Sequence, residues 1–370
     1  LFLILFFFVV TGSSVMAQLT GVKTIPGTYA TFAAAITDLN AQGVGAGGVT
    51  FNVAAGYIEQ IPAGGFVINI AINQPNASNP VIFQKSGLGA NPMCTTTVAG
   101  LGTVTVSTNG SNTDAFFKLN GTDWITFDAI DLLDNYTGAT TGPKTEAGYM
   151  FCRASATDGC KNITIKNCRI VLALTSAASL GYGIYSSQYT SGGTSTSATS
   201  IAGRHENIFI DGNTIERSLT GMYFDGTTDA VSPYSLYNNN IQVGVSSANT
   251  LIVGSRTSTN TTTQYGIYAV NCDSVKFNNN TVRMNAGTNA ATHYGIFTST
   301  GTNSNADIIG NNVSDTINSA GASQQIGIAN TFGTSGTNNP VNIQNNSVSN
   351  CAHITATGAP TITYMQNLAG

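Results

Sequence analysis

Four aspartates form the densest group of carboxylates in the chain: Asp123, Asp128, Asp131 and Asp134. A calcium ion takes about six to eight oxygen ligands, several of them from carboxylates. We therefore consider Asp128, Asp131 and Asp134 as candidate calcium ligands. The alternation of the apolar residues around them favours a simpler interpretation, in which Asp128 lies at a bend and the other carboxylates face solvent.

A short aromatic motif recurs as near copies at 182–185, 265–268 and 294–297. Each copy reads Tyr-Gly-Ile followed by Tyr or Phe. An outward row of tyrosines could stack against sugar rings, and our candidates are Tyr185 and Tyr268. Because neighbouring residues of a strand point to opposite sides, we do not expect both tyrosines of one motif to face the same way as its isoleucine. We favour the other interpretation, aromatic stacking that stabilises the strands.

The remaining residues that could do chemistry form no recognisable active site. The three histidines, His205, His293 and His353, share no metal-ligand spacing, and we expect them in loops or at the surface. The sequence contains no nucleophile-elbow, phosphate-loop or dinucleotide motif. We therefore predict no catalytic residue and no cofactor, with calcium as the one alternative.

The asparagines occur at regular places in a repeated pattern. Each repeat has an alternating apolar stretch, a polar pair or triplet, and a second alternating stretch. The copies lie at 162–171, 207–216, 234–243, 274–283, 306–315 and 340–349, and an earlier one at 124–133 uses Asp instead. Repeats of this spacing indicate a solenoid, a propeller or an array. The apolar period of two argues against helical repeats.

Three short strands per repeat, with uneven spacing, predict an all-β fold: a single right-handed parallel β-helix. Each strand would pair with its equivalent one turn away, at about 4.8 Å. The polar breaks would mark a sharp bend, since Asn tolerates the left-handed backbone region, and stacked amides can hydrogen-bond along a column. We expect Asn280 next to a left-handed residue and between Asn240 and Asn312. The predicted turn residues are Asn167, Asn213, Asn240, Asn280, Asn312 and Asn346.

Residues 31–43 differ from the repeats, because their apolar residues are spaced as on one face of a helix. Thr31 can cap the start of this helix and Gly43 can end it. A short amphipathic helix here would cap the first turn, whose open strand edges would otherwise invite pairing. Strands are predicted after it at 49–53, 66–70, 81–83 and 104–106.

The chain begins with ten apolar residues, LFLILFFFVV, and a small-x-Ala site follows at 15–17. The run is too short to cross a bilayer and is typical of a secretory signal peptide. Export permits disulfides, and one bridge among Cys152, Cys160 and Cys168 is a candidate. Cys168 and Cys272 fit better as small buried apolar residues. The predicted organisation is a signal peptide at 1–17, a cap and irregular first turns at 18–110, and regular turns at 111–370, in a natural protein that continues beyond both ends.

The N-terminal order of TFAAAI (31–36), a Gly-Gly pair, VTFNV (49–53) and GYIE (56–59) resembles the opening module of pectin-active right-handed β-helix proteins. The later repeats resemble those of pectate lyases and polygalacturonases. The whole resembles most the large secreted surface proteins of Bacteroidetes-type bacteria. This resemblance covers most of residues 20–350 and implies the fold. Pectate lyases would add a calcium site with a Lys or Arg base. Polygalacturonases would add several Asp motifs. This chain contains a counterpart of only one of them, Asn112-Thr113-Asp114.

Charged residues make up only 8% of the chain and the net charge is −4, so we expect no nucleic-acid partner. We expect no membrane span either. The leading hypothesis is a protein that is secreted or held on the outer surface of a bacterium. Its β-helix would serve as a stalk, adhesin or glycan-contacting scaffold, with a polysaccharide or a host or cell surface as partner. The alternative is a polysaccharide lyase or glycoside hydrolase that acts on acidic glycans.

Overall fold

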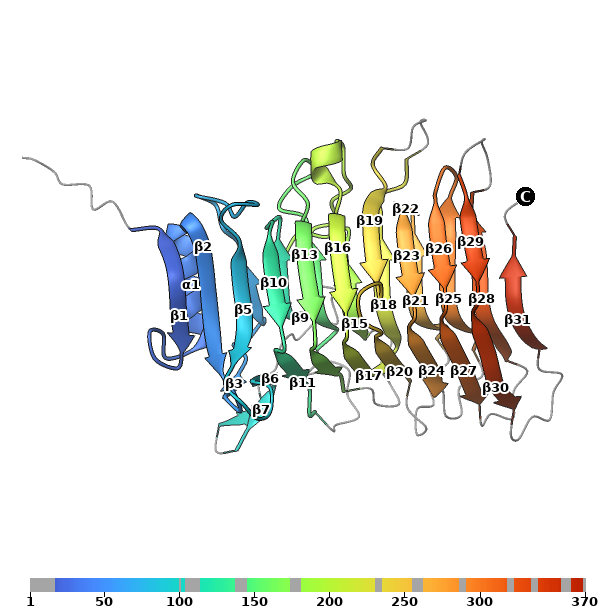
Figure 1. The fold of residues 1–370 in the computed structure, drawn as a ribbon, viewed down its shortest axis with the longest axis horizontal. Coiled ribbons are helices and arrows are strands. Elements are labelled where there is room, and N and C mark those ends of the chain that lie inside the picture. The colour runs from blue at the N-terminus through green and yellow to red at the C-terminus, as the bar shows by residue number, and fades with distance from the viewer. Residues whose placement is uncertain are drawn as a thin grey trace, which may run out of the picture.

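The computed structural model describes residues 17–99, 101–103, 114–136, 145–173, 181–229, 235–254, 262–285, 291–317, 323–333, 339–353 and 361–368. These residues form an elongated parallel β-solenoid whose first and last turns lie at opposite ends (Figure 1). Each turn contributes one strand to each of three sheets, which we call A, B and C. The predicted all-β class and parallel solenoid are confirmed. The predicted signal segment lies outside the described residues, except for Ala17.

The strands of each sheet follow one another along the solenoid. Sheet A contains β1 (Leu19–Ile25), β2 (Val44–Ala54), β5 (Val81–Ser86), β10 (Ile125–Asp128), β13 (Lys161–Lys166), β16 (Glu206–Asp211), β19 (Asn238–Val243), β23 (Val275–Asn278), β26 (Ala306–Ile309) and β29 (Val341–Gln344), and β22 (Cys272–Asp273) also pairs with β19. Sheet B contains β3 (Ile58–Gln60), β6 (Met93–Thr95), β11 (Asp131–Leu133), β14 (Arg169–Val171), β17 (Thr214–Ser218), β20 (Thr250–Val253), β24 (Thr281–Asn285), β27 (Asn312–Ile317) and β30 (Ser347–His353).

Sheet C contains β4 (Phe66–Ile68), β9 (Ala115–Asn120), β12 (Ala147–Cys152), β15 (Tyr182–Ser186), β18 (Thr220–Asp225), β21 (Gln264–Val270), β25 (His293–Gly301), β28 (Gln324–Phe332) and β31 (Thr361–Asn367). Two short strands, β7 (Thr97–Val98) and β8 (Gly102–Thr103), form a separate antiparallel pair. The strands predicted at 49–53, 66–70 and 81–83 correspond to β2, β4 and β5, and 104–106 lies outside the described residues.

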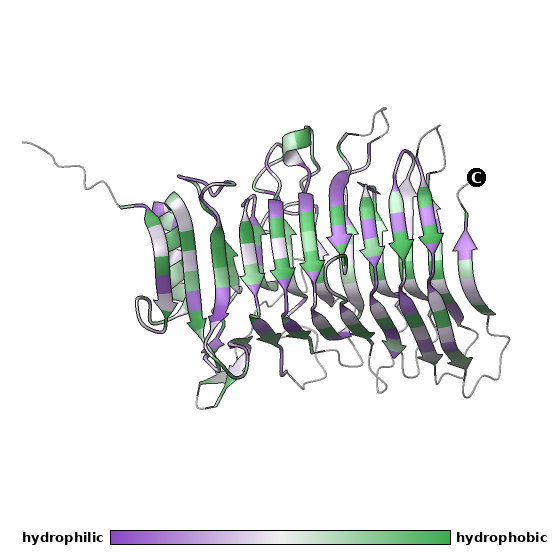
Figure 2. Cartoon of the chain, viewed as in Figure 1, coloured by the Kyte–Doolittle hydropathy of each residue, from purple (hydrophilic) through white to green (hydrophobic). Residues whose placement is uncertain are grey.

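The interior is a set of apolar columns, because the same position of each turn points inward. In sheet A one column begins with the stacked rings of Phe51, Phe83 and Phe127, whose successive centroids are 4.6 and 5.3 Å apart. The register then continues the column through Ile165 and Ile210. Apolar segments accordingly recur at matching places on neighbouring strands of sheet A (Figure 2). The period-two pattern of the sequence thus produces a continuous buried core.

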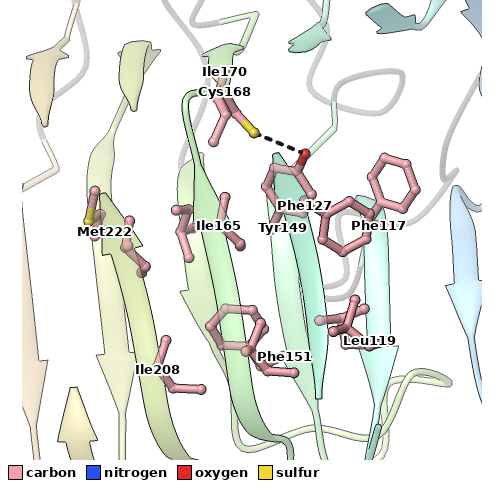
Figure 3. Close-up of a cluster of buried hydrophobic side chains, with 14 of the residues drawn as sticks. Phe117, Leu119, Phe127, Tyr149, Phe151, Ile165, Cys168, Ile170, Ile208 and Met222 are labelled. Carbon is pink, nitrogen blue, oxygen red and sulfur yellow. Dashed lines mark hydrogen bonds between the residues drawn. The ribbon is translucent and has the colours of Figure 1, made fainter. Parts of the chain in front are cut away.

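Polar groups inside this core find partners within it. The ring of Tyr149 lies among Phe117, Phe127 and the side chains of the next turns (Figure 3). Its hydroxyl donates to the backbone carbonyl of Ile130 at 3.0 Å and lies 3.8 Å from Cys168 Sγ. A buried phenol that is hydrogen-bonded in this way avoids the cost of an unsatisfied donor.

Helix α1 (Phe32–Gln42) forms where the sequence predicts it. The Thr31 hydroxyl accepts a hydrogen bond from the backbone N–H of Ala34, and Gly43 ends the helix with a φ of 66°. Helix α1 lies beside β1 and β2 at the N-terminal end of the solenoid (Figure 1). Phe32 is fully buried, with its ring 6.0 Å from that of Phe66 and 5.9 Å from that of Phe83. The helix is thereby joined to the first apolar columns.

The thiols of Cys152, Cys160 and Cys168 are free and buried, so the structure contains none of the candidate bridges among them. Cys168 and Cys272 are buried as small apolar residues, as the sequence indicated. Within the part of the chain that the structure describes, no helix is both long and apolar enough to cross a membrane.

Candidate functional site

The three candidate calcium ligands lie near one another in sequence but bind different partners. Asp128 ends β10, where its carboxylate accepts a hydrogen bond from Asn167 Nδ2 at 2.7 Å and pairs with Lys166 Nζ at 3.1 Å. Asp131 begins β11 and accepts hydrogen bonds from the backbone N–H of Arg169 at 2.8 Å and from Asn91 Nδ2 at 2.9 Å. Both carboxylates therefore link successive turns.

Asp134 is fully buried at the end of β11, which corrects the expectation that its carboxylate faces solvent. Its carboxylate accepts hydrogen bonds from the Thr96 hydroxyl at 3.0 Å and from the backbone N–H groups of Tyr136 and Thr145 at 3.0 and 2.9 Å. Burial raises the pKa of Asp134, and it also raises the pKa of Asp131. In the described residues, no three His, Cys, Asp or Glu side chains converge as metal ligands. Calcium binding stays a prediction, and it would require these hydrogen bonds to be exchanged for a metal.

A shallow hollow of about 330 Å³ lies beside Asp128, at the bend between sheets A and B. Its other lining residues are Gln84, Lys85, Asn91, Ala129 and Asn167. The side chain of Asp128 is 26% exposed and that of Lys166 is 42% exposed. This is the place where one of the predicted carboxylates and a basic side chain meet at the surface.

The aromatic motifs form one stacked row on the outer face of sheet C. Tyr185 pairs in register with Tyr223, and Tyr223 with Tyr268. Their ring centroids are 5.3 and 4.9 Å apart, with interplanar angles of 8° and 12°. The row ends against Phe297, whose centroid lies 5.4 Å from that of Tyr268.

Both aromatic residues of each motif face outward, opposite to the buried isoleucine. The two tyrosines therefore do not both face the same way as the isoleucine, as expected, but strict alternation would have turned only one of them outward. The rings of Tyr182 and Tyr185 stack at 4.5 Å, and those of Tyr265 and Tyr268 stack at 4.2 Å. The glycine after the first tyrosine interrupts the regular pairing of the strands. In the register, Tyr182 and Ile184 have partners on the neighbouring strands and Gly183 has none. The two aromatic residues on either side of the interruption therefore reach the same face.

This glycine has no room for a side chain. A Cβ on Gly266 would lie 2.3 Å from the backbone oxygen of Gly295 and 2.3 Å from Val282 Cγ1. The same collision with the next glycine of the column recurs at Gly148, Gly183, Gly221 and Gly295. The glycine of the motif therefore lets neighbouring turns approach at the corner between sheets B and C.

The ring faces of the two sugar-stacking candidates are covered by other rings. Tyr185 lies between Tyr182 and Tyr223, and only 3% of it is exposed. Tyr268 is half-buried between Tyr223 and Phe297. A sugar ring needs an open aromatic face, so this geometry favours the stabilising interpretation. Sugar stacking at these two residues stays an untested prediction.

An asparagine ladder runs along the bend between sheets A and B. The Nδ2 of each residue donates to the Oδ1 of the next, over distances of 2.9 to 3.1 Å. Each Nδ2 also donates to a backbone carbonyl of the preceding turn, as Asn280 does to Val243 at 3.0 Å. We call the following five residues the asparagine ladder: Asn213, Asn249, Asn280, Asn311 and Asn346.

A left-handed residue precedes most positions of this column, as expected for the bend. It is Gly212 before Asn213, Asn279 before Asn280, Gly310 before Asn311 and Asn345 before Asn346. One turn before the ladder the left-handed residue is Asn167, with a φ of 58°, and Cys168 occupies the ladder position. The backbone N–H of Cys168 donates to Asn213 Oδ1 at 3.0 Å. The predicted Asn167 is therefore a bend residue outside the ladder.

The predicted position of Asn280 between Asn240 and Asn312 is wrong, because its neighbours are Asn249 and Asn311. Asn312 is exposed in β27, since Gly310 takes the left-handed position and Asn311 follows it. Asn240 lies inside β19, since the triplet 238–240 precedes the apolar residues of its strand instead of following them. The similar asparagine triplets at 238–240 and 278–280 thus lie at different corners of the turn.

Asn240 belongs to a second, shorter ladder on sheet A. Its Nδ2 donates to Asn207 Oδ1 at 2.7 Å, and Asn207 Nδ2 donates to Asn162 Oδ1 at 3.0 Å. All three residues have a positive φ, between 51° and 57°. This ladder therefore marks a second irregularity that stacks from turn to turn.

The sequence predicts the histidines in loops or at the surface, and two of them are buried. His205 lies in the connection before β16, whereas His293 lies in a strand, which corrects its predicted place. His205 is fully buried at the corner between sheets C and A. Its Nδ1 accepts a hydrogen bond from the backbone N–H of Cys160 at 3.0 Å, and its Nε2 lies 3.0 Å from the Ser187 carbonyl oxygen. Burial lowers the pKa of His205 to about 3, so the ring is neutral.

His293 points into the core, with its Nδ1 3.2 Å from Asp315 Oδ2. Both side chains are buried, at 0% and 6% exposed. They come from β25 and β27, so they join sheets C and B inside the solenoid. His353 lies in β30.

Sequence reasoning also missed two carboxylates. Glu59 accepts hydrogen bonds from the backbone N–H groups of Phe32 at 2.6 Å and Ala33 at 3.1 Å, so it binds the N-terminus of α1. Glu146 lies beside Asp114, and burial together with the charge of Asp114 raises the pKa of Glu146 to about 8. Glu59 belongs to the GYIE segment at 56–59, so the N-terminal resemblance could have drawn attention to it. The partners of Glu146 lie a full turn away in sequence.

The geometry defines a parallel β-solenoid protein braced by stacked polar and aromatic side chains. No protein-family model and no curated protein matches the chain. Among solved structures it is similar to the lacto-N-biosidase of family GH136 from Eubacterium ramulus, with 12% identity and a TM-score of 0.45 over 80% of this chain and 52% of that one. This chain thus spans about half the length of that enzyme.

A second similar structure is the A-module of the Azotobacter vinelandii mannuronan C-5 epimerase AlgE6. Its identity is 14% and its TM-score is 0.29, over 91% of this chain and 94% of that one. At such identities and TM-scores the likeness concerns the fold, and neither activity is carried over to this chain.

Proposed function

We propose that this chain is an exported surface or extracellular scaffold of a bacterium, whose solenoid serves as a stalk or adhesin that contacts glycans. The observation that carries the proposal is that polar side chains of the solenoid form hydrogen bonds with other parts of the solenoid. The asparagine ladder, Asp131 and Asp134 each bind groups of the same or neighbouring turns. Side chains committed to bracing a column are suited to a rigid spacer. Export rests on the N-terminal sequence.

Two features of the architecture belong to this proposal. We take the coil to be right-handed, since parallel strands are joined by right-handed crossovers in about 98% of cases. Helix α1 acts as the cap of the first turn. Its support is the buried contact of Phe32 with the first columns and the Glu59 carboxylate at its N-terminus.

A polysaccharide lyase or hydrolase is the second candidate, favoured by one observation. Asp128 and Lys166 form an ion pair beside the hollow of about 330 Å³, which Lys85 also lines. Calcium at Asp128 could neutralise the carboxylate of an acidic glycan, and a lysine could then remove a proton.

The experiment that separates the two functions uses the purified chain with polygalacturonate and other acidic glycans, with and without calcium. Binding on a glycan array without chain cleavage supports the scaffold. Calcium-dependent cleavage that is lost in Asp128→Ala and retained in Glu216→Gln would overturn it. Glu216 is a suitable control, because it makes a surface ion pair with Arg169 at 2.8 Å.

A further inference from the structure

Six tyrosines of sheet C form an outward-facing array that we call the tyrosine ladder: Tyr182, Tyr185, Tyr223, Tyr265, Tyr268 and Tyr294. Tyr223 is its central member. It contacts Tyr185 of the preceding turn and Tyr268 of the following turn, and the three rings are nearly parallel. Consecutive rings of the ladder are thus held face to face by the strand register.

This arrangement suits a reaction between phenols. Two phenoxyl radicals couple when an ortho carbon of one ring meets an ortho carbon of the other. The rings of Tyr223 and Tyr268 are stacked with centroids 4.9 Å apart and planes 12° apart, so the two phenols face each other as neighbours. The strand pairing holds both partners at these positions.

A proton acceptor lies beside the tyrosine ladder. Asp225 lies two residues after Tyr223 in β18, so both side chains are on the same face. Its carboxylate accepts a hydrogen bond from Gln188 Nε2 at 2.9 Å, and its charge, after burial, raises the pKa of Tyr223. Burial raises the pKa of Tyr182 to about 12 and raises the pKa values of Tyr185 and Tyr223 further, so the phenols are protonated. Oxidation of a protonated phenol must remove a proton with the electron, and Asp225 can accept it.

We propose that the tyrosine ladder is a site of oxidative modification, at which dityrosine bonds join successive turns of the solenoid through Tyr223. The oxidant is hydrogen peroxide acting through a haem peroxidase. Each phenol loses one electron and one proton, and the proton of Tyr223 passes to Asp225. The two radicals form a carbon–carbon bond, and the two ring hydrogens return as phenolic hydrogens. Two electrons and two protons are lost in all, and one peroxide is reduced to two waters.

The bond would reinforce the column. Tyr185, Tyr223 and Tyr268 belong to three successive turns, so each bridge would close a loop through a whole turn. Closing such loops lowers the entropy of the unfolded chain. This inference is independent of glycan binding, since it requires only the stacked rings and a peroxide-driven oxidant.

The test treats the folded full chain with hydrogen peroxide and a haem peroxidase at low protein concentration, and then measures dityrosine fluorescence and maps tryptic peptides. Tyr185, Tyr223 and Tyr268 fall in different peptides, which cover residues 170–204, 218–256 and 257–276. We expect peptide 218–256 to be joined to each of the other two, with a mass lower by two hydrogen atoms. The yield per chain should not depend on protein concentration.

Tyr223→Phe should remove both cross-links, whereas Tyr237→Phe, in the same peptide, should leave them. Circular dichroism of both variants establishes that they are folded. Asp225→Asn should slow formation of the same products and change the pH profile of the rate. Cross-links that persist in Tyr223→Phe, that join only separate chains, or that form equally in urea would overturn the proposal.

Discussion

Asn280 Nδ2 lies 3.1 Å from Asn311 Oδ1, and the same Oδ1 accepts a hydrogen bond from the backbone N–H of Asn280 at 2.9 Å. One side-chain oxygen of a turn thus accepts both a side-chain and a main-chain donor of the preceding turn. Both residues are almost fully buried, at 0% and 1% exposed. The amides therefore satisfy the polar groups of a bend that has no access to water.

Asn280→Ala should lower the free energy of unfolding by about 1–3 kcal/mol, because it leaves buried partners of the amide unsatisfied. These partners include the Val243 carbonyl and Asn249 Nδ2. The measurement is the shift of the urea midpoint. Asn312→Ala is the matched control, since Asn312 is exposed, and its effect should stay within about 0.5 kcal/mol. Equal shifts for the two variants would contradict the role of the ladder.

Gly266→Ala should destabilise the chain by about 1–3 kcal/mol, since its Cβ must displace a backbone oxygen of the next turn. Gly192→Ala is the control, because the nearest atom to its Cβ is 3.9 Å away. Chemical denaturation of the two variants compares the effects. If Gly266→Ala is as stable as Gly192→Ala, the close approach of turns at this corner is wrong.

Glu59→Gln should weaken the attachment of α1 by about 1–2 kcal/mol. The two oxygens of the carboxylate each accept from one backbone N–H group at the positive end of the helix. In glutamine one of these acceptors becomes an amide nitrogen, and the negative charge is lost. Hydrogen exchange of residues 32–42 should become faster while exchange in the later turns is unchanged. Glu216→Gln, on the surface, is the control and should change little. Unchanged exchange in α1 would show that Glu59 does not hold it.

His205→Asn should make the stability less sensitive to acid. The folded pKa of His205 is about 3 and its ordinary value is 6.5, so below pH 6.5 the unfolded chain takes up a proton that the folded chain does not. Stability is therefore lost as pH falls from 6.5 towards 3, by up to about 1.4 kcal/mol per pH unit. Asn suits the position, because Asn238 makes the equivalent contact with the backbone N–H of His205.

The measurement for His205 is the free energy of unfolding at pH 7.5 and at pH 4.5, in parental chain and variant. The difference between the two proteins should narrow at the lower pH. A constant difference at both values would mean that the His205 ring takes up its proton as readily in the folded chain as in the unfolded chain, which would contradict the lowered pKa.

The strands and the helix could be read from local pattern. Thr31 and Gly43 define the ends of α1, and the apolar alternation places Phe127, Ile165 and Phe277 in the core. The candidate sites could not be read in this way. Asp128 and Asp131 are three residues apart, yet each is bound by side chains or backbone of other turns, and the lengths of the intervening loops decide which groups meet.

The sequence by itself determined a parallel solenoid, since only stacked strands bury an apolar period of two that recurs every turn. The tertiary structure decided which side chains stack. Asn249 belongs to the asparagine ladder although no repeat motif marks its loop. Asn240 is predicted to stack with Asn280 but lies at another corner, where it binds Asn207. Both tyrosines of each motif face outward on either side of the glycine. The physical reason is that hydrogen bonds and ring contacts form between turns, where register, not sequence spacing, sets the distance.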